Sequence, residues 1–417
     1  MNCFQCCSSV FLFLVILGCL PIYKMLHFVV KYKNNDLYLN YPSIFTQEAA
    51  MKKTSLSFMI TAGILGGIFT FSVSPHLADA FDLSGTLGAV IGGAQQYRQI
   101  DAYMDHINNT DDGRNEYFQA LIKDLGVSDN DYYTRLLDDI MGRLTQGIGA
   151  TDPSIYNKPY LYFLNADQTF NASCGLGHVM TVNEGIFNLS ENIDEIAVVI
   201  AHEMGHGQKD HVLHGTRKKL KTAIGSTILA GAIGGSAFSD KAMGVLTQHI
   251  NNVQITKKAE WEADNLAFDY CYQAGYNPGA GAALWERVIE KKGDTAGNFI
   301  GEIFSPNDHP GHKERRDNYE KKISALSGGR VTIKNNSDVV QINKKDFLKP
   351  APLADMSSTE RKYLVMGNLA AAYDHGQNIY DAYVQNGTVM LGNQAIFTPV
   401  SGDISAEEAV AILNRIK

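Results

Sequence analysis

Apolar positions in the first half of the chain follow two different spacings. Within residues 81–150 they recur at helical spacing, most clearly through 97–107 and 132–148, with polar residues between them. The pattern then changes to short runs rich in aromatic and β-branched side chains at 160–164 and 179–182, which are typical of strands. We therefore expect a helical segment followed by a small sheet.

Two longer amphipathic helices are expected further along the chain. The first begins near Asn192, which can cap it, and Glu195 three residues later can complete a capping box. The second covers about residues 259–274 and ends at Gly275, with Pro278 as a further stop signal. The pattern as a whole is that of a mainly helical α+β protein.

The C-terminal tail, residues 330–417, contains the same pattern twice. Each copy has a short apolar run rich in β-branched residues, then a phenylalanine and a proline, and then the start of a helix. Ser357 and Ser405 are the expected N-caps, with Glu360 and Glu408 three residues later. We expect a small duplicated α+β appendage in which a hairpin leads into a capped helix.

The N-terminal 80 residues do not have the pattern of a folded domain. Residues 51–80 run from a positive segment through an apolar stretch to a small-residue A-x-A end, which is the order of a secretory signal peptide. The alternative is an uncleaved membrane anchor. Residues 1–50 precede the expected start at Met51 and are either a doubtful extension or a membrane-inserted N-terminus. We expect export to the periplasm or cell envelope, with the protein either free or membrane-anchored.

Composition narrows the classes of partner and of metal site. A net charge of −8 leaves no excess of Lys and Arg to neutralise phosphates, which argues against nucleic acid as a partner. Four of the six cysteines lie in the first 50 residues. The other two, Cys174 and Cys271, are not in a CxxC arrangement, so a cysteine metal site is not expected. They are either a disulfide or two separate buried thiols.

Candidate chemistry is concentrated in the first long helix, in the sequence His202-Glu203-Met204-Gly205-His206. Two histidines at this spacing lie one turn apart on one helix face, where their imidazoles can bind a single zinc ion. Glu203 projects beside them and can take a proton from water. The alternative explanation is a pair of solvated histidines on a surface helix.

The second long helix offers the third ligand that a catalytic zinc site needs. Glu260 and Asp264 are four residues apart, so both can face the first helix. We expect Glu260 to bind the metal and Asp264 to accept a hydrogen bond from a ligand histidine, which fixes the tautomer of that histidine. Glu262 lies about 160° from Glu260 around an ideal helix and is expected on the surface.

The HExxH sequence and the later Glu260-Trp261-Glu262-Ala263-Asp264 together resemble peptidase family M48 over about residues 95–325. The resemblance implies a mainly helical, zincin-type metalloprotease domain at 81–329, with a small sheet beside the active-site helix. It also implies one zinc ion per chain. The long membrane hairpins of some family members are absent from the sequence, which favours the soluble exported branch of the family.

Several further positions match the family. Asn171 and Ala172 match its strand beside the active site, which implies a role in holding substrate. His309 matches a later His-Pro motif and is implied as a donor to the oxyanion or as a fourth ligand in a resting form. Arg315, in the same motif, is implied to fix that loop or to pair with a carboxylate such as Asp264.

Other residues near these motifs have weaker interpretations. His211 fits the extended pattern of the family but is expected, like His214, to be structural or solvated. His312 matches no motif position. The family often has arginine where this chain has Lys257, so an ion pair made there is expected to be reorganised.

The expected function is a zinc-dependent endopeptidase that hydrolyses peptide bonds in unfolded or misfolded envelope proteins. The alternative is an envelope assembly or binding factor, in which the tail docks a protein partner and protease activity is latent. A membrane-embedded protease is a third reading, which depends on whether residues 56–73 are cleaved and whether the apolar segment 223–238 inserts.

Overall fold

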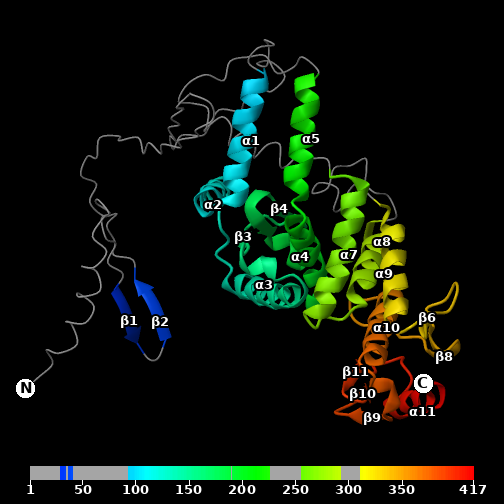
Figure 1. Cartoon of the computed structure of the whole chain (residues 1–417). Coiled ribbons are helices and arrows are strands. Elements are labelled where there is room, and N and C mark those ends of the chain that lie inside the picture. The colour runs from blue at the N-terminus through cyan, green and yellow to red at the C-terminus, as the bar shows by residue number, and fades with distance from the viewer. Residues whose placement is uncertain (1–28, 34–35, 41–92, 189, 226–254, 293–309) are drawn as a thin grey trace, which may run out of the picture. The chain divides into compact units, whose positions relative to one another are not determined.

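The computed structural model describes residues 29–33, 36–40, 93–188, 190–225, 255–292 and 310–417 (Figure 1). The chain divides into two units, Met1–Leu56 and Ser57–Lys417. The described part of the first unit is an antiparallel hairpin of β1 (Val29–Lys33) and β2 (Asp36–Asn40). The expected signal peptide at 51–80, most of the apolar segment 223–238 and His309 lie outside the described residues.

Three helices come first in the described part of the second unit, as the helical spacing of apolar residues predicts. They are α1 (Gly93–Asn109), α2 (Asp111–Leu125) and α3 (Asp131–Thr151). The side chain of Thr110 caps α2 and that of Asn130 caps α3, each by accepting a hydrogen bond from a backbone N–H of the first turn.

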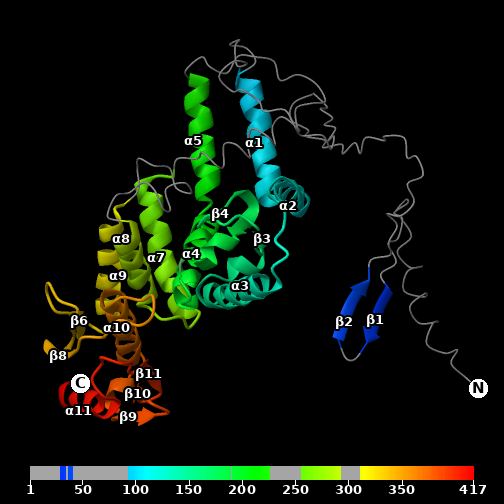
Figure 2. The same cartoon turned by 180° about the vertical axis from the view of Figure 1, so that it is seen from behind.

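Helix α1 runs beside α5 (His211–Gly225), as Figure 1 and the reverse view in Figure 2 both show. Arg217 on α5 joins the two helices, since it donates to Asp101 at 2.7 Å and to Asp105 at 2.8 Å on α1. These ion pairs are partly exposed and contribute about 0–1 kcal/mol each.

A three-stranded sheet follows the first helices, with strand order β3-β5-β4. β3 (Leu161–Asn165) pairs parallel with β5 (Val179–Asn183), and β4 (Ala172–Cys174) pairs antiparallel with β5 at the edge. The turn before β5 requires Gly177, because its φ is +69° and a Cβ there would lie 2.6 Å from the Ile107 carbonyl oxygen. Both expected strands are confirmed.

The histidine after this turn is expected to make the fold sensitive to acid. His178 is buried, its ring stacks on Tyr160, and its Nδ1 lies 2.8 Å from the Lys158 carbonyl oxygen. Burial, together with the charge of Lys158, lowers the pKa of His178 to about 4. As the pH is lowered, His178 of the unfolded chain binds a proton at about pH 6.5, whereas His178 of the folded protein binds one only at about pH 4. We therefore expect the free energy of unfolding to fall by about 1.4 kcal/mol for each pH unit of acidification within this range.

Urea unfolding of His178→Gln and of the parent protein, across this pH range, measures the contribution of His178. The variant is expected to lose much of the slope. His214→Gln, a change at an exposed position of α5, is the control and should retain it. If the free energy of unfolding of His178→Gln depends on pH as steeply as that of the parent protein, other groups cause the acid sensitivity.

Helix α4 (Ile193–Gln208) begins where the sequence predicts, with the Asn192 side chain as its cap. The expected capping box is wrong. The backbone N–H of Asn192 donates to Ser190 at 3.0 Å, whereas the carboxylate of Glu195 accepts hydrogen bonds from the Asn192 side chain and from Arg287. Glu195 is fully buried, so a long-range arginine takes the place of the local backbone partner.

Three more helices complete this part of the unit: α7 (Lys257–Gln273), α8 (Ala280–Lys292) and α9 (His312–Leu326). α7 is capped by Thr256 and ends before Gly275, whose φ is +76°. α4 packs against α7, and α8 packs against α9. Short 3₁₀ turns lie at Pro153–Tyr156, Leu176–His178, Glu184–Asn188 and Gln377–Ile379.

The tail contains the expected duplication, but each copy has a three-stranded sheet instead of a hairpin. The first copy is β6 (Val331–Ile333), β7 (Val340–Ile342), β8 (Lys345–Leu348) and α10 (Ser358–Asp374). The second is β9 (Ala382–Gln385), β10 (Thr388–Leu391), β11 (Gln394–Phe397) and α11 (Ala406–Ile416). The register shifts at corresponding positions, Val340/Gln341 and Val389/Met390.

The caps of the two tail helices differ. Ser357 and Glu360 form the expected capping box at the start of α10. Ser405 caps α11 by accepting from the Glu408 backbone N–H.

One hydrophobic cluster joins α3, α4, α7, α8 and α9 to the tail, whereas buried side chains of α1, α2 and α5 form a second cluster. α10 packs against both α8 and α9, and buried side chains of the tail such as Met366 and Leu369 belong to the same cluster as Trp285 and Met204. In the part of the chain that the structure describes, no helix has the length and apolar character needed to cross a membrane.

Candidate metal centre

The candidate site lies where α4 crosses α7. α4 is buried continuously from Glu195 to Gly207, so the side chains of His202, Glu203 and His206 are enclosed by the protein. Gly205 lets the two helices approach, since a Cβ there would lie 3.2 Å from the Cα of Ala263 on α7. At this close approach the carboxylates of Glu260 and Asp264 on α7 face the two histidines of α4.

Three buried side chains converge as a set that could hold one metal ion: His202, His206 and Glu260. The two histidine Nε2 atoms are 3.0 Å apart. One carboxylate oxygen of Glu260, Oε2, lies 3.5 Å from Nε2 of His202, and the other, Oε1, lies 3.4 Å from Nε2 of His206. Two ligand atoms that each lie about 2.1 Å from a tetrahedral zinc ion are about 3.4 Å apart, so these separations fit zinc.

Glu203 lies beside this set with one of its oxygens held in place. Its Oε2 accepts a hydrogen bond of 3.0 Å from the Cys174 backbone N–H, at the edge of the sheet. Its Oε1 has no hydrogen-bond partner among the described residues. Burial raises the pKa of Glu203 to about 8, and the nearby Glu260 carboxylate acts in the same direction, whereas His202 opposes it.

Asp264 joins a ligand histidine to a buried arginine. His202 Nδ1 is 3.0 Å from Asp264 Oδ1, and the carboxylate can only accept, so this nitrogen donates and Nε2 carries the lone pair that a metal ion would need. Arg315 Nε donates to Asp264 Oδ2 at 2.7 Å, and its Nη2 also contacts the carboxylate. Burial opposes ionisation, but Arg315 and His202 hold the pKa of Asp264 below its usual value.

The sequence profile of peptidase family M48 matches residues 134–323, which begin in α3 and end in α9. This segment contains all the residues of the candidate centre. Residues 134–323 are a peptidase domain of family M48. The domain is a metalloprotease of the mainly helical α+β class, as the sequence motifs predict.

The chain is similar to several proteins that are named as proteases. It is 28% identical to metalloprotease LoiP of Escherichia coli (strain K12), over 44% of this chain and 70% of that protein. It is 27% identical to mitochondrial metalloendopeptidase OMA1 of Arabidopsis thaliana, over 35% of this chain and 28% of that protein. It is 21% identical to the beta-barrel assembly-enhancing protease of Escherichia coli (strain K12), over 58% of this chain and 47% of that protein. The chain therefore spans less than half of the last two relatives.

The structure brings most of the expected site residues of the M48 domain together. His202, Glu203, His206, Glu260 and Asp264 form the contacts described above. Ala172 begins the edge strand whose Cys174 contacts Glu203, and Asn171 directly precedes it. The expected pairing of Arg315 with Asp264 is present. His309 lies outside the described residues, and the ion pair of Lys257 is made with Glu314 on the surface.

His211, which was expected to be structural or solvated, lies directly behind His206. Its Nδ1 lies 2.9 Å from Nδ1 of His206, and its Nε2 lies 3.5 Å from the carboxylate of Glu262. Since the carboxylate accepts from Nε2, the other nitrogen of His211 is free to accept from His206. Glu262 is partly exposed, as expected, but it orients a residue behind the metal centre. The spacing of His211, five residues after the last histidine of HExxH, was the feature of the sequence that could have predicted this contact.

We expect His211→Phe to weaken metal binding by about 10-fold, because it removes the hydrogen bond behind His206 and keeps an aromatic ring in the space. Competition with a chromophoric chelator measures this change. His214→Phe, on the exposed face of the same helix, is the matched control and should bind metal like the parent protein. Equal affinity in both variants would show that His211 only fills space.

His312 matches no motif position, but it packs close to the candidate centre. It is buried at the start of α9, and its ring stacks on Trp285 with 5.3 Å between centroids. Trp285 also lies under the guanidinium of Arg315, with the Cζ atom 3.8 Å from the ring centroid. His312 and Trp285 thus pack around the arginine that holds Asp264. No sequence motif marked Trp285.

The two cysteines of this region are separate buried thiols. Cys174 and Cys271 are both unpaired, so the disulfide alternative is wrong for this structure. Burial raises the pKa of each thiol.

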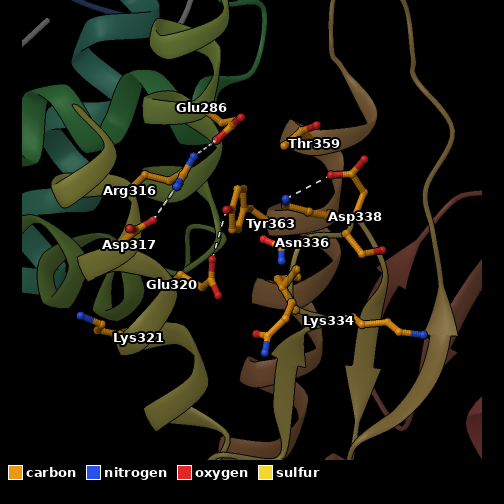
Figure 3. A pocket seen from close by; sticks show the side chains of 14 residues that line it. Glu286, Arg316, Asp317, Glu320, Lys321, Lys334, Asn336, Asp338, Thr359 and Tyr363 are labelled. Carbon is orange, nitrogen blue, oxygen red and sulfur yellow. Dashed lines mark hydrogen bonds and ion pairs between the residues drawn. The ribbon is translucent and has the colours of Figure 1, made fainter. Parts of the chain in front are cut away.

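A cavity of about 610 Å³ lies apart from the metal centre, between α9, α10 and the loop that joins β6 to β7 (Figure 3). Its walls carry charges that pair with one another. Arg316 donates to Glu286 at 2.7 Å, and Lys362 donates to Asp338 at 3.2 Å. None of the expected site residues lines this cavity, so it does not belong to the candidate centre.

Proposed function

We propose that the chain is a zinc-dependent endopeptidase that hydrolyses unfolded or misfolded proteins of the cell envelope. The observation that carries the proposal is the convergence of three buried ligand side chains beside a buried carboxylate that has one uncommitted oxygen. Two imidazoles and a carboxylate form one of the ligand sets of catalytic zinc sites, and they leave a fourth position open. His202, His206 and Glu260 would hold one zinc ion per chain.

The residues around the site have separate roles in the proposed reaction. When bound, zinc supplies Lewis acidity that makes water more acidic and polarises a peptide carbonyl. Glu203 accepts the proton from the attacking water through its free oxygen and later delivers it to the leaving amine. Asp264 and Arg315 hold His202 in the tautomer that leaves Nε2 available. His309, from the family motif, is the proposed donor to the oxyanion.

The edge strand β4 supports a site for extended polypeptide. Asn171 C=O and Gly175 N–H bond to β5, so the main chains of Ala172 and Cys174 face away from the sheet. The Cys174 N–H on this free edge already points at Glu203. A substrate strand that pairs with this edge would pass the proposed general base. The side-chain oxygen of Asn171, which has no partner among the described residues, can accept from it.

This binding mode favours unfolded substrates, because only an unpaired stretch of main chain can add to a sheet edge. The signal-peptide pattern at 51–80 supports export, and with it substrates in the periplasm or envelope. N-terminal sequencing of the exported protein tests the cleavage. An intact N-terminus would favour the membrane anchor.

Metal content and substrate preference test the proposal together. The purified mature protein is expected to contain one zinc ion per chain and to cleave casein, and to cleave a disulfide-reduced protein faster than its folded form. A folded protein that binds no zinc would overturn the proposal. Equal rates on folded and unfolded substrate would leave the zinc protease and remove the proposed substrate class.

A further inference from the structure

A single buried arginine joins the metal-binding helix to the tail. Arg287 on α8 is 1% exposed and contacts three carboxylates. Its Nε donates to Glu195 at 3.0 Å, its Nη1 donates to Asp355 at 2.7 Å, and its Nη2 lies 3.4 Å from Glu360. Glu195 belongs to the first turn of α4, whereas Asp355 and Glu360 belong to the tail at the start of α10.

Glu195 is placed so that its anchoring bears on the metal ligands. It precedes His202 by seven residues and His206 by eleven, and at 100° per residue all three lie within about 20° of one stripe of α4. On this face of α4, Arg287 contacts Glu195 near the N-terminal end, and the carboxylates of α7 contact the histidines toward the C-terminal end. Movement of the first turn would turn or slide both histidines relative to Glu260.

A second contact fixes the tail against the same region. The backbone N–H of Asn277, in the connection between α7 and α8, donates to Asp194 at the start of α4, and the Asn277 side chain donates to the Leu364 carbonyl of α10 at 3.0 Å. Gly367 makes this approach possible. A Cβ there would lie 2.2 Å from the Gly279 backbone nitrogen, so α10 lies directly on the backbone of that connection.

These contacts are costly to lose. Glu195 and Glu360 are both essentially buried, so without Arg287 two carboxylates would remain inside the protein with no cation between them. The first turn of α4 or of α10 would have to move toward solvent.

We propose that Arg287 is a positioning residue that couples tail helix α10 to the metal-binding helix, which makes the tail a required part of the catalytic unit. This inference rests on the proposed zinc-peptidase function for its activity readout but not for the mechanical coupling. It changes the expected role of residues 330–417 from a separable docking appendage to a support for the metal centre.

The test compares Arg287→Met with Arg361→Met in the full mature chain. Arg361 is the matched control, because it is also a buried arginine paired with a buried carboxylate, Asp403, but this pair lies wholly within the tail. Four measurements are made on each protein: the thermal midpoint, zinc affinity by chelator competition, hydrogen exchange in residues 193–208, and kcat and KM for peptide cleavage.

Both variants are expected to lower the thermal midpoint. Only Arg287→Met should speed exchange in α4, weaken zinc binding by about 10-fold or more, and lower kcat with little change in KM. Arg287→Lys should recover part of the zinc affinity, because a single ammonium can face Glu195 but cannot bridge three carboxylates. If Arg287→Met does not fold, Glu360→Gln, which keeps the Arg287–Glu195 pair, should change the same quantities less and in the same direction.

Exchange in α4 that is unchanged, or that rises equally in both methionine variants, would overturn the coupling. A parent protein without zinc would contradict the proposed function instead, and the exchange comparison would still decide the role of Arg287. Faster exchange with unchanged zinc affinity and kcat would show that Arg287 is structural only.

Discussion

Glu203→Gln is expected to lower kcat for peptide hydrolysis by about 10²- to 10⁴-fold while zinc remains bound. The amide oxygen of glutamine can still accept the hydrogen bond from the Cys174 N–H, so the side chain should keep its position. It cannot accept a proton from water. Because Glu203 is not one of the three converging ligands, the loss should be confined to turnover.

Steady-state cleavage of a quenched fluorescent peptide, with zinc content measured on the same samples, separates these effects. Glu191→Gln removes an exposed carboxylate just before α4 and should leave kcat unchanged. A fully active Glu203→Gln enzyme would remove Glu203 from the reaction. A variant that loses its zinc would show instead that Glu203 supports the ligand set.

Glu260→Gln is expected to weaken zinc binding by more than about 100-fold. Substitution of a residue that only hydrogen-bonds to a metal ligand typically costs about 10- to 100-fold in affinity, and Glu260 is a proposed ligand itself. The side chain is fully buried and provides the only anion among the three converging ligands. An amide of the same shape donates and accepts weakly, and it does not neutralise the ion. Activity should fall in step with bound zinc.

Thermal unfolding with and without added zinc measures the same loss independently. A ligand that binds only the folded state stabilises it by about 4 kcal/mol at a concentration 1,000 times its Kd, so the parent protein should show a clear zinc-dependent shift. The shift should shrink in Glu260→Gln and persist in Asp269→Asn, an exposed carboxylate change on the same helix. A full shift in Glu260→Gln would exclude it as a ligand.

The sequence predicted the local part of the site well because that part depends on helix periodicity. His202 and His206 are one turn apart on any helix, and the same holds for Glu260 and Asp264. Asn192 marked the correct start of α4, and Gly275 marked the end of α7, which begins two residues earlier than expected. The strand pattern at 160–164 and 179–182 likewise identified the sheet.

The contacts that the sequence did not predict join residues far apart in the chain. Glu195 has the spacing of a capping-box residue, but Arg287, which lies 92 residues later, takes its carboxylate. The position of Trp285 under Arg315 depends on how α8 packs on α9, which no local pattern specifies. The first strand of each tail copy, β6 or β9, was missed because three or four residues are too few to show the alternation of a strand.

The buried thiols of the metalloprotease domain have a consequence for how the protein matures. Cys174 and Cys271 are both enclosed, unpaired and held in the protonated form by burial. No sulfur in the described part of the chain therefore needs to be oxidised before the metal centre can assemble, and no thiolate there competes with the imidazoles for the ion. Disulfide formation is therefore not a step that the described part of this domain requires to reach the structure seen here.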